Sequence, residues 1–259
     1  PGATYAGGGI PGITLNGVDV TRELTGGRIG AALVLRDQTL PTWQAELDEF
    51  AETLATRFDA QGLTLFTDPA GAVPAGGGTP VQAGYVGFAG TIQVNPAVQA
   101  DPTLVRDGTT AIAGSATGAS AFTPNPAGGP AGFTDMITRV LTYALGREAQ
   151  SGVPQPAAAT TGLGPDGTLN APYVAPLSLG DMATTLVAAQ AQESSLATGQ
   201  LATEQAVQSG LTARLSAMSG VSIDAEMAHM ITLQNAYAAN ARVMSTAQAL
   251  FQQLLGMVQ

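Results

Sequence analysis

The C-terminal stretch from Ser222 to Val258 constrains the fold of this chain more than any other feature, because it carries a long and regular apolar pattern. Alternating steps of four and three residues from Ile223 select eleven positions, nine of them apolar. A stripe with this spacing over five heptads is typical of a helix that lies along another helix in a coiled coil. We call these positions the seam: Ile223, Met227, Met230, Gln234, Tyr237, Ala241, Met244, Gln248, Phe251, Leu255 and Val258.

A second apolar row beside the seam widens the face, so we expect this helix to contact more than one partner. Its members are Leu233, Ala236, Val243, Ala247, Leu250, Leu254 and Met257. Ser222 is placed to cap the first turn, and Asp224 and Glu226 lie where the helix dipole favours carboxylates. Burial of a large apolar side chain stabilises by roughly 1.5–3 kcal/mol. The seam therefore represents on the order of 10 kcal/mol or more, and we expect a partner to cover it.

Tyr237, Asn240 and Arg242 form the polar and aromatic centre of this helix. Two interpretations remain open: a core tyrosine with two solvated neighbours, or a group that fixes the register by hydrogen bonding across an interface between subunits. The residues predicted to form an assembly interface are Ile223, Met227, Met230, Leu233, Tyr237, Asn240, Ala241, Arg242, Met244, Phe251, Leu254, Leu255 and Val258.

The composition argues against several classes of function. The net charge of the 259 residues is -10, and the nine basic side chains are all scattered arginines, so the sequence predicts no nucleic-acid partner. No run of 18 apolar residues occurs, so no transmembrane helix and no membrane partner are expected. The chain has no cysteine and therefore no thiolate metal site. The acidic residues show no calcium-loop spacing and are interpreted as a solvated surface.

Changes in composition predict five parts. They are the end of a β element with a linker at 1–27, a helical domain at 28–61 and 133–218, a β and loop excursion at 62–132, a Pro/Gly/Ala-rich surface loop at 148–177, and a C-terminal coiled-coil helix at 219–259. The β-prone runs are short: a hairpin around Asn16-Gly17, then Leu63–Phe66, Tyr85–Phe88 and Thr91–Val94. The predicted fold class is mainly α with an inserted β/loop region, in which long coiled-coil-type helices form part of a helical bundle and a small β excursion lies in the middle.

The other two long helical patterns are less regular than the seam. The pattern at 29–61 contains Pro41, which implies a kink or a restart. Its apolar face is predicted to hold Leu33, Leu40, Leu47, Phe50, Leu54 and Phe58, with Arg36, Asp37, Glu46, Asp48, Glu49 and Glu52 mostly off that face. The pattern at 178–218 has polar residues where a core would be, at Glu193, Gln200 and Thr203. This helix is therefore expected to be partly solvated, or packed against polar partners.

The motifs tested for chemistry support neither catalysis nor cofactor binding. Gly7–Gly12 and Gly162–Gly167 have the G-x-G-x-x-G spacing, but each has a proline where a nucleotide-binding helix would begin, so both are interpreted as loops. Ser120 resembles the serine of a nucleophile elbow without its final glycine. The single histidine, His229, lies beside the seam and is interpreted as a residue flanking a helix interface. We expect no catalytic residue, no cofactor and no metal.

Two stretches resemble a known family. Residues 220–255, from Gly220-Val-Ser-Ile-Asp-Ala-Glu-Met to Leu-Phe-Gln-Gln-Leu-Leu255, resemble the C-terminal helix shared by the bacterial flagellar axial proteins, which are rod, hook and hook-associated proteins. Gly26-Gly-Arg-Ile-Gly with Arg36-Asp-Gln-Thr39, Glu46-Leu-Asp-Glu-Phe50 and Ile92-Gln-Val-Asn-Pro-Ala-Val98 are similar to the hook-associated protein 1 family, the first hook–filament junction proteins. The resemblance covers 26–61, 88–108 and 178–259.

The resemblance implies a non-enzymatic structural subunit that joins hook to filament, is secreted without a cleaved signal peptide, and lies in the extracellular flagellum. It implies three axial partners, namely hook protein, the second junction protein and copies of the chain itself. In that family the terminal helix also pairs with an N-terminal helix of the same protein. No counterpart of that helix occurs here, so the sequence is expected to be a C-terminal portion. Alternatives are another axial protein, namely hook, rod or hook-associated protein 3, or a module whose C-terminal helix binds an export chaperone.

Overall fold

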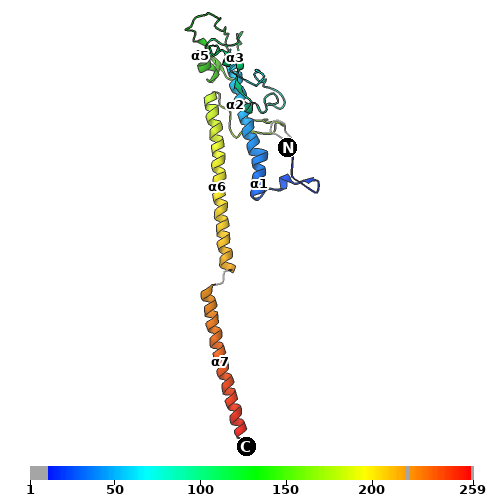
Figure 1. Cartoon of the computed structure of the whole chain (residues 1–259), viewed down its shortest axis with the longest axis vertical. Coiled ribbons are helices and arrows are strands. Elements are labelled where there is room, and N and C mark those ends of the chain that lie inside the picture. Colours follow the sequence, from blue (N-terminus) through cyan, green and yellow to red (C-terminus); the bar gives the residue numbers. More distant parts are fainter. Residues whose placement is uncertain (1–10, 220–221, 258–259) are drawn as a thin grey trace. The chain divides into compact units, whose positions relative to one another are not determined.

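The computed structural model describes residues 11–219 and 222–257, and its elements follow the chain as labelled in Figure 1. The chain divides into two compact units, Pro1–Ser194 and Ser195–Gln259, which are described separately. The helices are η1 (Thr21–Glu23), α1 (Gly27–Val34), η2 (Leu35–Thr39), α2 (Leu40–Ala60), η3 (Phe88–Gly90), α3 (Pro96–Ala100), α4 (Leu104–Asp107), α5 (Asp135–Arg139), η4 (Val140–Ala144), α6 (Leu179–Ser219) and α7 (Ile223–Gly256). The strands are β1 (Thr14–Leu15), β2 (Val18–Asp19), β3 (Phe66–Thr67), β4 (Gln93–Val94), β5 (Glu148–Gln150) and β6 (Val153–Pro154).

The predicted class, mainly α with a small β excursion, is confirmed. The strands form three antiparallel pairs, β1-β2, β3-β4 and β5-β6, and only β3-β4 lies within 62–132. The β1-β2 hairpin turns at Asn16 and Gly17, whose φ angles of 51° and 81° are those that a two-residue hairpin turn requires. The β interpretation of Tyr85–Phe88 was wrong, because Tyr85 N–H and Phe88 N–H bond to carbonyls three residues back and form turns.

A π-helical turn, η2, joins α1 to α2 without a loop. Pro41 follows it in the first turn of α2 and, because the helix continues from η2, it cannot donate a backbone hydrogen bond to the preceding turn. The turn contains one residue more than a regular α-helical turn, so it shifts the phase of the side chains that follow. This shift explains why the predicted apolar face was partly wrong: Leu33 is 8% exposed, but Leu40 and Leu47 are 50% and 40% exposed.

The end of α2 is fixed by a glycine. Gly62 has a φ of 99°, its N–H bonds to Asp59 O, and Leu63 N–H bonds back to Phe58 O, which together form a Schellman motif. A Cβ atom on Gly62 would lie 2.5 Å from a ring carbon of Phe122, so only glycine fits here.

The core of the first unit forms around this helix end. One cluster of buried residues consists of Phe58, Leu63, Phe122, Met136, Ala144 and Leu179, and a second consists of Ala51, Ala55, Tyr85 and Phe88. The first cluster joins α2 to α5, η4 and the start of α6. Arg139 lies over the Phe122 ring at 5.2 Å and donates to Gln61 O, Ser120 Oγ and Ser120 O, so it fastens the 120 loop to the end of α2.

Three acidic residues of α2 correct the prediction of a solvated acidic surface. Glu46, Asp48 and Glu49 are only 2%, 0% and 5% exposed. Asp48 accepts hydrogen bonds from the N–H groups of Gly87 and Ala89 at 2.7 and 2.9 Å. Loops packed against a helix bring backbone N–H groups that need acceptors, and the carboxylates of Asp48 and Glu49 supply them. Burial raises the pKa of Asp48, although these hydrogen bonds act in the opposite direction.

The predicted surface loop at 148–177 is partly buried. Leu163 is completely buried, and Gln155 is 6% exposed. Gly164 N–H donates to Gln82 Oε1 at 2.7 Å, and Ala159 N–H donates to the Glu49 carboxylate. The loop therefore covers α2 through its backbone donors, which its composition did not indicate.

Candidate assembly surface

The second unit contains the end of α6 and all of α7. Ser222 Oγ accepts a hydrogen bond from Ala225 N–H at 3.3 Å, as expected of the N-cap. Asp224 and Glu226 lie in the first turn, as the sequence indicated. At 1.5 Å per residue, the 34 residues of α7 extend over about 50 Å. The sequence therefore located both the beginning of this helix and its length.

Every described residue of α7 is exposed. Ile223, Tyr237 and Phe251 are 75%, 80% and 70% exposed. The other described members of the predicted interface are also exposed: Met227, Met230, Leu233, Asn240, Ala241, Arg242, Met244, Leu254 and Leu255. Val258 lies outside the described residues. A helix with so much exposed apolar surface is typical of an interaction site, so the assembly interface stays a prediction that this exposure supports.

The geometry of a straight helix separates the predicted residues into two flanks. At 100° per residue, Asn240 lies one step from Ala241 on the side of the second apolar row, in the line of Ala236 and Val243. Arg242 lies one step in the opposite direction. Asn240 is therefore placed within the apolar face, whereas Arg242 lies away from that face, in the line of Asn235 and Gln253.

The seam also winds around α7. A heptad stripe drifts by about 20° per heptad on a straight α-helix, which amounts to about 100° over five heptads. A partner helix can follow the whole seam only by winding around α7 in the left-handed sense. A straight partner would leave one end of the seam and meet the second row instead.

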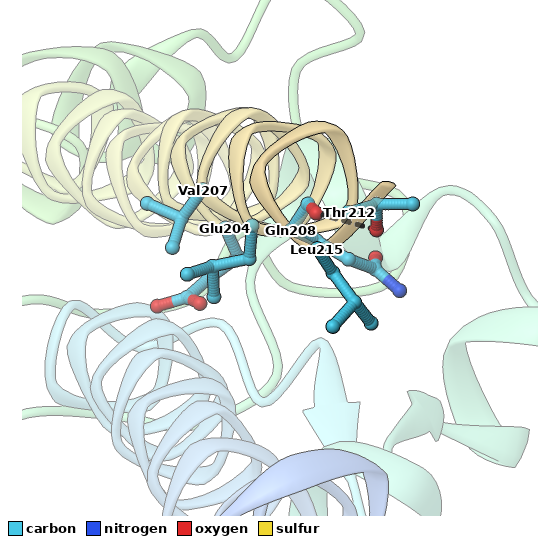
Figure 2. A pocket seen from close by; sticks show the side chains of 6 residues that line it. Glu204, Val207, Gln208, Thr212 and Leu215 are labelled. Atoms are coloured by element: carbon cyan, nitrogen blue, oxygen red, sulfur yellow. Dashed lines mark hydrogen bonds between the residues drawn. The ribbon is translucent and has the colours of Figure 1, made fainter. Parts of the chain in front are cut away.

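The part of α6 that lies in the second unit also exposes apolar side chains. Figure 2 shows Val207 and Leu215 projecting from one helix together with Glu204, Gln208 and Thr212. These residues and Leu211 line a shallow hollow of about 280 Å³. Thr212 Oγ1 donates to Gln208 O at 2.9 Å, so this polar contact stays within the helix. The hollow lies between side chains of one helix, and Glu204 is the titratable group in its lining.

Several buried polar residues of the first unit, among them Glu49, Arg57 and Gln61, line a different hollow, of about 310 Å³. Burial raises the pKa of Glu52 to about 7, with the charge of Glu49 adding to the effect. Burial lowers the pKa of Arg57 to about 10, and its guanidinium donates to Leu177 O and Pro156 O at 2.6 and 3.2 Å. Because its lining holds no histidine or cysteine, a nucleophile with an adjacent imidazole base is not available there.

The other sequence motifs do not form a site. Gly162–Gly167 is a loop with three glycines at positive φ, closed by a bridge between Leu163 and Leu169. Ser120 lies in a loop, and His229 is an exposed residue of α7. Gly7–Gly9 lie outside the described residues. Within 11–219 and 222–257, no group of three acidic, histidine or cysteine side chains is arranged to hold a metal ion, and no helix is long and apolar enough to cross a membrane.

Comparison with known families gives two matches. Residues 7–71 match the family model described as flagellar hook-associated protein FlgK helical domain. Residues 215–257, which include all of α7, match the family model described as flagellar basal body rod FlgEFG protein C-terminal. Searches of curated proteins and of solved structures find no match. The two family matches support a FlgK-like hook-associated identity and a structural role in the flagellum.

Proposed function

We propose that this chain, with its FlgK-like identity, is a non-enzymatic structural subunit that joins the flagellar hook to the filament and assembles through α7. The observation that carries the proposal is the exposure of every described seam residue, Ile223 to Leu255, on a helix that matches the C-terminal family model. Full burial of Met227, Met244 and Leu255 alone would contribute about 5–9 kcal/mol. That amount is comparable with the net stability of a small domain.

The proposed partners are helices of other axial subunits, including hook protein, the second junction protein and further copies of this chain, and the N-terminal helix of the same protein. In coiled-coil pairing of this kind, the partner helix packs against the heptad stripe of α7, and no cofactor is needed. The subunit would act outside the cell in the assembled flagellum, after secretion without a cleaved signal peptide.

The test is assembly in a flagellated cell in which the native gene carries three seam substitutions, Tyr237→Ala, Met244→Ala and Leu255→Ala. Electron microscopy and a motility assay are expected to show hooks without attached filaments. The matched control carries Asn235→Ala and Gln253→Ala on the opposite side of the same helix and is expected to swim normally. Normal filaments in the seam variant would refute the proposed assembly surface.

A second candidate function follows from the same exposure: before assembly, an export chaperone would cover α7. A chaperone is expected to form a stoichiometric complex with the protein on a sizing column and to lose it in the seam variant. If the seam variant keeps the complex but fails to assemble, the chaperone site and the assembly surface are different. If no flagellar chaperone forms a complex, α7 is not a chaperone site.

A further inference from the structure

One buried acid of α2 has no acceptor role. Glu46 is 2% exposed, and neither of its carboxylate oxygens has a hydrogen-bond partner among the described residues. Its neighbours Asp48 and Glu49 accept hydrogen bonds from loop backbones and from Tyr85. A buried carboxylate without hydrogen bonds is costly when charged and far less costly when protonated.

A second carboxylate, that of Glu193, comes from the part of α6 that belongs to the first unit. Glu193 Oε2 accepts a hydrogen bond from Trp43 Nε1 at 2.8 Å, and Glu193 Oε1 accepts one from Thr39 Oγ1 at 3.2 Å. These bonds join α6 to the beginning of α2. Gln190 of α6 also lies near Glu46 and acts to lower the pKa of its carboxyl, against the larger effects of burial and of Glu193.

The titratable groups around Glu46 are acids and a phenol. They are Glu193 from α6, Tyr173 from the loop before α6, and Glu49 from α2 itself. The pKa of Tyr173 is raised by burial and by the charges of Glu46 and Glu49. None of these groups can neutralise an ionised Glu46, so its negative charge would meet a second negative charge at the contact between α2 and α6.

We propose that Glu46 is a pH-sensitive latch: when protonated, it allows residues 187–194 of α6 to dock on α2, and when ionised, it weakens that contact. The preceding turns of α6 are held independently, because Leu179, Met182 and Leu186 are buried in the core. Beyond Leu186, the exposed Val187 buries little apolar surface against α2. The contact there depends on the hydrogen bonds that Glu193 accepts from Thr39 and Trp43. The latch lies at the boundary of the first unit, which ends at Ser194.

The direction of the pH effect follows from linkage. In the docked state the pKa of Glu46 is raised from 4.5 to about 7, first by burial and then by Glu193. An undocked, solvated Glu46 has its ordinary pKa, so the docked state binds the extra proton between these two values. Docking is therefore strongest below pH 4.5, weakens as the pH rises to about 7, and changes no further above it. The docking equilibrium is expected to fall by up to roughly 300-fold across this range.

Trp43 makes the latch measurable, because it is the single tryptophan of the chain and donates directly to Glu193. In the full protein, the wavelength of tryptophan emission is expected to shift to the red as the pH rises from 4.5 to about 7, with an unchanged helical signal in circular dichroism. Glu46→Gln is expected to keep the docked emission throughout pH 5.5–8.5, because an amide cannot ionise. Glu193→Gln is expected to reduce the size of the emission change, because without the neighbouring charge an ionised Glu46 opposes docking less.

The matched control is Glu52→Gln, the same chemical change on the same helix. The pKa of Glu52 is also raised to about 7, but its carboxylate faces Gly76 rather than α6, so the wild-type transition is expected to persist. A flat emission profile in the wild type, the same transition in Glu46→Gln, or a loss of helical signal in step with the emission shift would each overturn the latch.

Discussion

Replacement of Asp48 by alanine tests whether α2 holds the loops around it through its buried acids. The substitution leaves the N–H groups of Gly87 and Ala89 without their acceptor, and Gln44 Nε2 loses a bond of 3.0 Å. A buried donor without a partner costs about 1–3 kcal/mol, so the two backbone groups together cost about 2–6 kcal/mol. Removal of a buried charge offsets part of this cost. We expect a net loss of about 3 kcal/mol in the free energy of unfolding.

The assay is urea unfolding followed by the fluorescence of Trp43, which reports on the first unit. With a slope of about 2 kcal/mol per molar urea, the midpoint should fall by roughly 1.5 M. The urea midpoint of Asp48→Asn should lie between those of the wild type and Asp48→Ala, because the single amide oxygen of asparagine can still accept a hydrogen bond from one N–H. Asp166→Ala, at an exposed loop position, serves as the control and should leave the midpoint unchanged. If Asp48→Ala changes the free energy of unfolding by less than about 0.5 kcal/mol, as a neutral surface substitution does, Asp48 is not an important hydrogen-bond acceptor for the loop.

Two further substitutions test the core. Gly62→Ala should lower the free energy of unfolding, measured by thermal melting, by about 2 kcal/mol or more, because the new methyl group would meet the Phe122 ring and the φ angle of 99° is strained for alanine. The control Gly26→Ala, at a negative φ with open space around it, should change the free energy of unfolding little in the same experiment. Met136→Ala should cost about 2–5 kcal/mol in urea unfolding because the side chain is completely buried, whereas Met218→Ala, at 88% exposure, should be neutral for the monomer. Equal effects of Met136→Ala and Met218→Ala would contradict the described core.

Features set by neighbours along the chain could be predicted from the sequence. The cap at Ser222 and the hairpin turn at Asn16-Gly17 depend on the chemistry of a few consecutive residues, and both occur as expected. The seam could be predicted because one helix carries the whole pattern. Its role as an interface depends on molecules that the sequence does not describe, so that part remains a proposal.

Features set by distant segments could not be predicted. The acids of α2 looked like a solvated face, since nothing near Asp48 indicates that the loop at 87–89 will bring unpaired N–H groups to it. Tyr85–Phe88 looked β-prone because of its residue types, but tertiary packing overrides that preference. Tyr85 is buried against α2 and donates to Glu49 Oε2 at 2.6 Å. In both cases the partner lies more than 30 residues away.

The π-helical turn η2 has a consequence for how the length of this chain can vary. Its wide turn contains one residue that a regular α-helix would not need, and Leu40 N–H reaches back five residues to Leu35 O. Deletion of a single residue from 35–39 would therefore turn η2 into a regular α-helical turn and leave α1 and α2 facing nearly the same sides as before. Leu33 would stay in the core while α2 kept its contacts. Orthologues that lack one residue here should accordingly present the same side of α1 to the same core, with no change in any loop.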